Sequence, residues 1–295
     1  MSRVLITGGA GFLGARVVAL ARGAGHEVIS ADVIRGADIA LDVGDPAAVA
    51  STIESTRPEA IVHLAALLTD AGERAPVEAT RVNALGTAAV FAAAGNQRCE
   101  RVIFASSISA VGPTQGTLGD DAHLTPGNVY GATKAFCEHL ARAMVAHLNA
   151  PRYLGLRFGY VYGPGRVRGW CDLQGLIERV AAGERELTYP DYPEAIDWTW
   201  VGDAADTLKR ALECPLPRFK VVNVAGDKRR VREAIAHLQR TFPDLRADPV
   251  AATTPPSAWD LVNDGLEALL GRVPTTTLEQ GIDQLLAALR ESPKR

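Results

Sequence analysis

The stretch Thr7-Gly8-Gly9-Ala10-Gly11-Phe12-Leu13-Gly14 follows a short β-branched run, Arg3-Val4-Leu5-Ile6, and leads into an alanine-rich stretch with helical character. Its glycines repeat every three residues, at Gly8, Gly11 and Gly14. A glycine turn that opens a helix lets backbone N–H groups approach a pyrophosphate at the positive end of that helix. Between a strand and a helix, the pattern is a strong indication of a dinucleotide-binding loop rather than a plain tight turn.

Outward from this loop, short apolar β-rich runs alternate with longer helical stretches. We expect strands over residues 3–6, 27–30, 60–64, 101–104, 153–158 and 220–224, and helices over residues 12–24, 83–94, 132–148, 203–212 and 278–290. Such alternation predicts an α/β fold, a Rossmann-type doubly wound parallel sheet that binds its ligand at the carboxyl ends of the strands.

Asp32 ends the second expected strand, 18 residues after Gly14. An acidic side chain there accepts hydrogen bonds from both hydroxyls of an adenosine ribose and repels a 2′-phosphate, which predicts NAD rather than NADP. Two alternatives stay open: Asp32 as a solvated turn residue, and a nearby Arg35 that weakens the preference for NAD. Asp42-Val43 fits a loop near the adenine, and Leu64-Ala65-Ala66 provides small residues against a flat cofactor, although both stretches also fit simple packing.

Tyr130 and Lys134 stand one helical turn apart, so a phenol and an ammonium share one helix face. The ammonium favours the phenolate, and a tyrosine in this position can act as a general base or acid. Ser106-Ser107 follows an expected strand, where a hydroxyl can orient a substrate oxygen; a helix cap or turn is the alternative role for these serines. Asn83 taken alone is most simply a helix cap.

These motifs together resemble the extended short-chain dehydrogenase/reductase family, in its NAD-dependent epimerase/dehydratase branch. The resemblance rests on Thr7 to Gly14, Asp32, Asp42-Val43, His63-Leu64-Ala65-Ala66, Asn83, Ser106-Ser107, Tyr130 with Lys134, Leu156-Arg157, Tyr162-Gly163-Pro164-Gly165, Leu270 to Pro274 and Leu278 to Ile282. It covers nearly the whole chain, and the motifs occur in family order. It implies a Rossmann domain that binds NAD(P), a small C-terminal substrate domain and a homodimer formed through the helix of Tyr130.

The resemblance also implies roles for individual residues. Tyr130 would be the catalytic acid/base, Lys134 would bind the nicotinamide ribose, Ser107 would hold the reacting oxygen, and Asn83 would support the site through a water to Lys134. The cofactor-binding residues would be Gly8, Gly11, Phe12, Leu13, Gly14, Asp32, Asp42, Val43, Leu64, Ala65, Ala66, Asn83, Ser106, Tyr130, Lys134, Phe158 and Gly159.

The second half of the chain loses the regular alternation and is punctuated by proline and glycine from Gly163 onward. We predict an NAD-binding Rossmann domain over residues 1–159 and 196–225, and a smaller C-terminal substrate-binding cap over residues 160–195 and 226–295. In this half, Trp198 and Trp200 form an aromatic pair for which a core strand is favoured over sugar stacking.

The sequence departs from the family pattern where nucleotide sugars are bound. Tyr160 and Ile196 occupy positions at which nucleotide-sugar epimerases usually carry an Asn and an Arg for the sugar diphosphate, which lowers the expectation of a nucleotide sugar. Ile108-Ser109 replaces the acid pair of the 4,6-dehydratases, so elimination is not expected.

An anionic substrate is the alternative that the arginines suggest. Arg166 and Arg168 can bind an acidic group on the substrate, the alternative being two surface arginines. They belong to the segment 152–185, which holds six arginines against three acids, and we expect this positive excess to lie at the substrate entrance.

The whole-chain composition excludes several functions. With 31 Lys and Arg against 34 Asp and Glu, the 295-residue chain has a net charge of −3, so no overall positive field would hold a nucleic acid. No apolar run reaches 18 residues, which argues against a membrane span. The four cysteines, Cys99, Cys137, Cys171 and Cys214, lack the spacing of metal ligands and suggest small apolar core residues in a reducing compartment. The histidines have no ligand-like neighbours, so we assign no metal. We expect a cytoplasmic protein.

The sequence therefore predicts an NAD-dependent oxidoreductase that transfers a hydride at a hydroxyl or keto carbon of a sugar, sugar acid or related polyol. The alternative is a nucleotide-sugar 4-epimerase of the UDP-glucose type, which works by transient oxidation. A non-catalytic NAD(P)-sensing regulator on the same fold is a third possibility, against which Tyr130, Lys134 and Ser107 argue.

Overall fold

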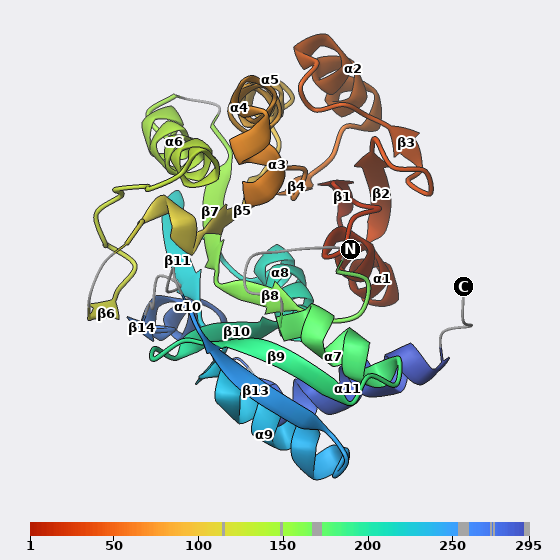
Figure 1. Cartoon of the computed structure of the whole chain (residues 1–295). Helices are drawn as coiled ribbons and strands as arrows, with labels where there is room; N and C mark the ends of the chain where they lie inside the picture. The colour runs from red at the N-terminus through yellow and green to blue at the C-terminus, as the bar shows by residue number, and fades with distance from the viewer. Residues whose placement is uncertain are drawn as a thin grey trace.

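A seven-stranded parallel sheet forms the centre of the protein (Figure 1), seen in a computed structural model that describes residues 1–113, 116–147, 150–166, 173–252, 260–271, 273 and 275–291. The strand order is β11-β7-β5-β4-β1-β2-β3. The strands are β1 (Arg3–Thr7), β2 (Glu27–Asp32), β3 (Ile39–Ala40), β4 (Ala60–His63), β5 (Arg101–Ser107), β7 (Arg152–Phe158) and β11 (Phe219–Val224). All six predicted strands are confirmed within this sheet, and the two-residue β3 extends it beyond them.

Helices cover both faces of the sheet, as its β-branched and leucine-rich strands require. One face packs against α1 (Gly14–Gly23), α8 (Val201–Glu213) and α10 (Asp264–Leu270). The other face packs against α2 (Pro46–Thr56), α5 (Gly86–Asn96) and α6 (Val129–Met144), with α3 (Thr69–Arg74) and α4 (Pro76–Ala79) next to α6. The predicted doubly wound Rossmann-type fold is confirmed.

The strand order reverses direction beside β1, which pairs with β2 on one side and with β4 on the other. At such a point the two neighbouring connections leave the sheet toward opposite faces and open a crevice at the carboxyl ends of the strands. The glycine-rich loop lies at this point because it directly follows β1. Helix α1 begins at Gly14 rather than at Phe12, since residues 8–13 form the loop itself.

A second layer of smaller elements lies beside the carboxyl ends of the sheet (Figure 1). It contains α7 (Leu173–Ala181), α9 (Val231–Thr241), α11 (Leu278–Glu291), the sheet β12-β10-β8 and the strand pair β13-β9. These strands are β8 (Tyr160–Tyr162), β9 (Glu186–Asp191), β10 (Ile196–Trp200), β12 (Asp227–Arg229) and β13 (Arg246–Ala251), and a short pair, β6 (Thr117–Leu118) with β14 (Asp260–Leu261), stands apart. Among the described residues, no helix is both long and apolar enough to span a membrane.

Aromatic side chains of β8 and β10 form the centre of this second layer. Trp198 and Trp200 are buried and pack edge-on against Tyr162, which confirms a core strand for this aromatic pair. The strand that carries them, β10, pairs with β8 and β12 rather than with the large sheet. The predicted division of the chain into a Rossmann domain and a cap, at residues 159, 195 and 225, stays a prediction. That division assigns β10 to the Rossmann domain, yet β10 pairs with β8 and β12 of the predicted cap.

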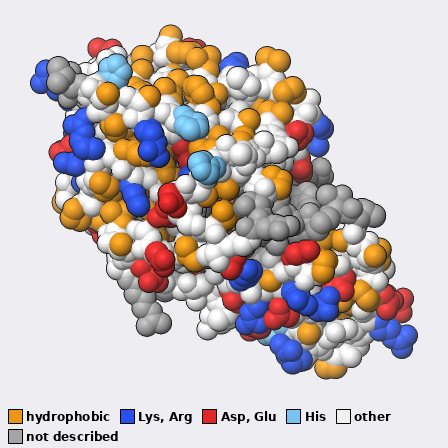
Figure 2. Space-filling model, turned by 90° about the vertical axis from the view of Figure 1, so that its left-hand side faces the viewer, with side chains coloured by type: hydrophobic (Ala, Val, Ile, Leu, Met, Phe, Trp, Pro, Cys, Tyr) orange, Lys and Arg blue, Asp and Glu red, His pale blue; other side chains and the backbone are white. Residues whose placement is uncertain are grey.

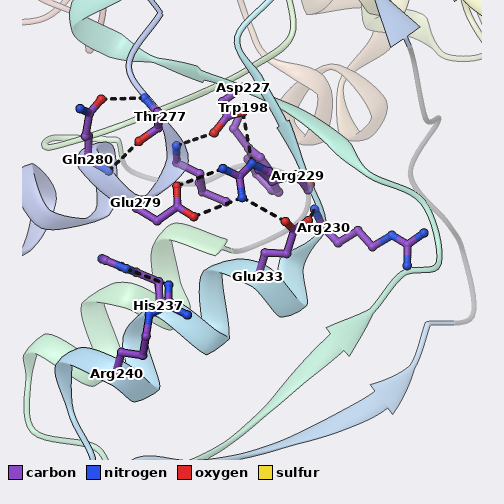
Figure 3. Close-up of polar contacts among 11 residues, drawn as sticks. Trp198, Asp227, Arg229, Arg230, Glu233, His237, Arg240, Thr277, Glu279 and Gln280 are labelled. Atoms are coloured by element: carbon purple, nitrogen blue, oxygen red, sulfur yellow. Dashed lines mark hydrogen bonds and ion pairs between the residues drawn. The ribbon is translucent and has the colours of Figure 1, made fainter.

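Polar contacts join α9 and α11 to β12 (Figure 3). Arg229 on β12 pairs with Glu233 of α9 and Glu279 of α11 at 3.0 and 3.2 Å, so one guanidinium bridges two helices. Helix α11 begins with a capping box: the Gln280 amide N–H donates to Thr277 Oγ1 at 3.2 Å, and Gln280 Oε1 accepts from the Thr277 amide at 3.0 Å. These contacts satisfy backbone donors that the first helical turn would otherwise leave without a partner.

Loss of this cap is expected to weaken the second layer. Thr277→Ala should lower the free energy of unfolding by about 1 kcal/mol, because one backbone donor of α11 loses its side-chain acceptor. Thr277→Ser, which retains the hydroxyl, should stay close to the wild type. Urea unfolding followed by circular dichroism measures both variants, and equal midpoints for Thr277→Ala and wild type would contradict the capping role.

Candidate active site

The glycine-rich loop has a shape that only glycine allows at two positions. Gly8 has a φ of +71°, and a Cβ there would lie 2.6 Å from the backbone nitrogen of Ala65. A Cβ on Gly14 would collide with the carbonyl oxygen of Gly8. The loop is therefore folded tightly against the segment that follows β4 and leads directly into α1, which is the arrangement that binds a pyrophosphate.

Asp32 ties this loop to the end of β2. Its carboxylate is buried and accepts from the Ala10 amide at 3.0 Å and from the Ile34 amide at 3.1 Å. The alternative of a solvated turn residue at Asp32 is therefore wrong. An ionised carboxylate has about four acceptor sites, and these two bonds leave capacity for ribose hydroxyls.

The residues expected around the rest of the cofactor lie on neighbouring loops. Asp42 accepts from the Gly44 amide at 2.8 Å and pairs with Arg81 at 2.9 Å, and the Arg81 guanidinium lowers the pKa of this carboxyl. Val43 is buried in the core beneath α5. Leu64, Ala65 and Ala66 follow β4 directly. Phe12 and Leu13 stand at the entry to α1 and pack toward the second layer.

Asn83 lies in a π-helical turn, η1 (Thr80–Leu85), which precedes α5 inside the helix predicted over residues 83–94. Its amide pairs with both backbone groups of Leu67: Oδ1 accepts from the N–H at 2.8 Å, and Nδ2 donates to the carbonyl at 2.9 Å. Nδ2 also donates to Thr133 Oγ1 at 3.1 Å. Asn83 thus fixes the segment after Ala66 to helix α6 by direct contacts, and its expected water-mediated link to Lys134 stays a prediction.

Helix α6 begins beneath Asn128, whose side chain accepts from the Gly131 amide at 2.7 Å. One turn later Lys134 is buried and donates from Nζ to the carbonyl oxygen of Ala105 at 2.8 Å. The same Nζ lies 5.5 Å from the centre of the Tyr130 ring. An ammonium has three donors, so two remain for a ribose and for stabilising a phenolate.

The two serines at the end of β5 have different surroundings. Ser107 Oγ accepts from the Ser109 amide at 3.1 Å and caps the short turn η2 (Ile108–Ala110), which leaves its O–H out of that bond. Ser106 points to the opposite face of the strand and donates to Glu138 Oε1 at 2.5 Å. The expected contact of Ser106 with the cofactor stays a prediction, and this hydrogen bond gives Ser106 a structural role as well.

Glu138 forms a buried ion pair with Arg157, with contacts of 2.9 and 2.8 Å and both side chains 4% exposed. Arg157 also donates to the Asp120 carbonyl at 2.9 Å. The pair joins α6 to β7 just before Phe158 and Gly159. Removing one partner of such a pair leaves an uncompensated buried charge, so this contact holds α6 firmly on the sheet.

Asp197 of β10 lies under the end of β7. A Cβ on Gly159 would lie 2.8 Å from Asp197 Oδ1, so only a glycine lets the chain pass this carboxyl. Asp197 accepts from the Gly226 amide at 2.8 Å, and burial raises the pKa of its carboxyl to about 6. Next to it, the Tyr160 ring lies 5.9 Å from that of Trp198.

The positive excess of the segment 152–185 is largely neutralised. Arg157, Arg179 and Arg185 pair with Glu138, Glu184 and Asp244, and Arg152 lies at the opposite end of β7 from the glycine loop. Figure 2 shows basic and acidic side chains interspersed on the face that it presents. Arg152 is thus away from the expected entrance, whereas for Arg157, Arg179 and Arg185 the expected place at the entrance stays a prediction. Arg166 donates to the Val161 carbonyl, and Arg168 lies outside the described residues.

The structure therefore brings Tyr130, Lys134, Ser107, Asn83 and the glycine loop to one edge of the sheet, and the loop fits a dinucleotide. Sequence reasoning missed the roles of Glu138 and Thr133. The signal for Glu138 is its spacing, since it follows Lys134 by four residues on the same face of α6. For Thr133, which faces the neighbouring helix, the sequence holds no comparable signal.

Comparison with known proteins agrees with this geometry. The model of the NAD dependent epimerase/dehydratase family matches residues 4–225. The dTDP-glucose 4,6-dehydratase of Xanthomonas campestris pv. campestris (strain B100) is 26% identical, with 96% of this chain and 91% of that protein covered.

Two solved structures are similar over nearly the whole chain. MoeE5 in complex with UDP-glucuronic acid and NAD is 27% identical with a TM-score of 0.87, and the match covers 98% of this chain and 99% of that one. The UDP-glucose 4-epimerase of Thermus thermophilus in complex with NAD is 25% identical with a TM-score of 0.85, and the match covers 99% and 100%.

The buried carboxyl of Asp197 predicts a pH-dependent stability. The pKa of Asp197 in the folded protein, about 6, lies above its unfolded value. The contribution of this carboxyl to the free energy of unfolding is therefore fully present below about pH 4 and is lost as the pH rises to about 6. The loss amounts to roughly 3 kcal/mol. Asp197→Asn should remove this slope in chemical unfolding measured from pH 4 to 7, whereas Asp248→Asn, at an exposed position of β13, should follow the wild type. Parallel curves for Asp197→Asn and wild type would refute the assignment.

Proposed function

The chain belongs to the NAD-dependent epimerase/dehydratase family, and from its site we propose that it transfers a hydride at a hydroxyl or keto carbon of a sugar or sugar derivative. The observation that carries the proposal is the anchoring of Lys134 on the Ala105 carbonyl, which fixes an ammonium beside Tyr130 next to the glycine loop. A regulator that only senses NAD would have no use for a buried ammonium fixed beside a phenol.

Each residue has a defined task in this reaction. NAD, when bound, supplies the hydride acceptor. Tyr130 takes the proton from the oxygen of the substrate hydroxyl as the hydride leaves the carbon that bears this hydroxyl, and it returns a proton to the oxygen in the reverse direction. The positive charge of Lys134 stabilises the phenolate, its remaining donors hold the nicotinamide ribose, and the O–H of Ser107 donates to the substrate oxygen.

A nucleotide sugar is the substrate class that the similar proteins support. MoeE5 was solved with UDP-glucuronic acid, and the Thermus thermophilus protein is named a UDP-glucose 4-epimerase. We therefore keep the 4-epimerase as the second candidate, with transient oxidation by a retained NAD. This chain carries Tyr160 and Ile196 at two positions where nucleotide-sugar epimerases usually have an Asn and an Arg for the diphosphate. We therefore propose Arg166 and Arg168 as the partners of an acidic group on the substrate.

A dehydratase is less well supported, despite the similarity to dTDP-glucose 4,6-dehydratase. The two residues after Ser107 are the buried, apolar Ile108 and Ser109. Neither carries a carboxyl that could remove a proton and protonate a leaving hydroxyl. Elimination would therefore need groups from elsewhere in the site.

We also propose a homodimer through α6. Phe136 of α6 is 44% exposed, and Leu85 and Val77 are exposed on the neighbouring elements η1 and α4. Large apolar side chains exposed on elements that contact one another support an interface over this part of the surface. The cytoplasmic location expected from the sequence stays a prediction.

The proposed acid/base is tested by Tyr130→Phe. This variant should lose turnover by about 10²-fold to 10⁴-fold because the proton has no acceptor, while its affinity for NAD should stay close to that of the wild type. Tyr153→Phe is the matched control, since Tyr153 stands at the opposite end of β7 from Phe158 and its hydroxyl lies 3.9 Å from Met144 Sδ. Steady-state rates and NAD titration measure both variants, and an active Tyr130→Phe would refute the mechanism.

The two candidate reactions are separated by the behaviour of the nicotinamide. A dehydrogenase should reduce added NAD, seen by the absorbance of the reduced nicotinamide, with one member of a panel of sugars, sugar acids and sugar nucleotides. An epimerase should retain NAD through purification and interconvert two sugar nucleotides without net reduction. A protein that binds NAD and does neither with the whole panel would contradict the proposed function.

A further inference from the structure

A chain of buried hydrogen bonds starts at the last residue of β1. Thr7, directly before Gly8, lies with Oγ1 2.7 Å from His63 Nδ1. On the other side of the ring, His63 Nε2 lies 3.0 Å from Thr87 Oγ1 on α5. Thr87 in turn donates to the carbonyl oxygen of Asn83 at 2.6 Å. Three elements, β1, β4 and α5, are thus joined through one imidazole.

The chain continues to the first turn of α6. The Asn83 side chain donates from Nδ2 to Thr133 Oγ1 at 3.1 Å, and Thr133 donates to the carbonyl oxygen of Tyr130 at 2.7 Å. Each residue between the two ends is at most 5% exposed. The path therefore runs, shielded from water, from the nucleotide loop to the backbone of the proposed acid/base.

The directions of these bonds fix the tautomer of His63. A hydroxyl has one hydrogen, and that of Thr87 is used on the Asn83 carbonyl, so Thr87 Oγ1 must accept from His63 Nε2–H. Burial lowers the pKa of His63 to about 3, helped by the charge of Lys134, so the ring is neutral at pH 7. Nδ1 then accepts from the hydroxyl of Thr7. A second positive charge at His63 would repel Lys134.

We propose that His63 is a positioning residue which, as its Nε2–H tautomer, couples the NAD-binding loop to the turn of α6 that carries Tyr130. The proposal rests on the proposed role of Tyr130 and gives that site a connection to its cofactor loop. A displacement of the loop on NAD binding passes through Thr7 to the ring, and from the ring through Thr87 and Asn83 to Thr133. Hydrogen-bond networks between rigid elements can carry such coupling, and this one has a defined partner at every step.

The first test examines the tautomer in the wild-type protein. With ¹⁵N-labelled histidine, one imidazole should show a protonated Nε2 and an unprotonated Nδ1 at pH 7, with an N–H proton protected from solvent exchange. Loss of its Nε2 hydrogen bond in Thr87→Val assigns it to His63. A protonated Nδ1 at this ring would overturn the proposal.

The second test measures the coupling with Thr7→Val, Thr87→Val and the double variant, which remove hydroxyls and conserve shape. The readouts are the dissociation constant for NAD and the change in the Tyr130 ¹³Cζ chemical shift on NAD binding. Thr207→Val is the control, because Thr207 is also fully buried but its Oγ1 has no hydrogen-bond partner among the residues that the structure describes. This control should leave both readouts unchanged.

Thr87→Val should weaken NAD binding about tenfold and reduce the Tyr130 shift, although Thr87 is on α5 and not in the loop. The double variant should also lose about tenfold rather than a hundredfold, because a path that is cut once carries no further coupling. The proposal would be overturned if the losses in NAD affinity of the two single variants added up in the double variant. It would also be overturned if Thr87→Val lowered the stability of the protein but changed neither readout. Neither readout uses a sugar substrate, so failure to find a substrate would count against the proposed function alone.

Discussion

The seating of α6 on the ends of β5 and β7 is the constraint on which the rest of the site depends. Lys134 fastens the helix to the Ala105 carbonyl, and one turn later Glu138 fastens it to Ser106 and Arg157. These contacts are buried, and the ion pair contributes only while both partners are present. They set the height and rotation of the helix, and therefore the position of Tyr130 relative to Ser107.

A second and independent set of contacts positions the nucleotide loop at the same edge of the sheet. Gly8 lets the loop fold against Ala65, and Asp32 holds the loop from the other side through the Ala10 amide. Asn83 closes the edge between them, since its amide pairs with Leu67 and reaches Thr133 of α6. The nucleotide loop and the reactive helix are thus fixed to a common rigid sheet, which is how an enzyme positions groups precisely enough for hydride and proton transfer.

The local sequence was sufficient to predict the large sheet, the glycine loop and the Tyr130–Lys134 face, because each depends on periodicity or on spacing within one element. It was insufficient where partners come from distant segments. The pairing of Glu138 with Arg157 joins residues of different elements, and the placement of Trp198 in a small separate sheet follows from strand pairing with β8 and β12. The arginine excess between residues 152 and 185 shows the same limit: a charge count over this segment contains no information about Glu138 and Asp244, which lie outside it and pair with Arg157 and Arg185.

We expect NAD to bind with its nicotinamide between the end of β5 and Tyr130, and a crystal structure of the complex with NAD tests this central claim most directly. Lys134 Nζ should keep the Ala105 carbonyl and lie about 3 Å from a hydroxyl of the nicotinamide ribose, with Tyr130 and Ser107 facing the reactive ring carbon. A nicotinamide that lies outside the reach of Tyr130, with the Lys134 ammonium making no contact to the ribose, would contradict it.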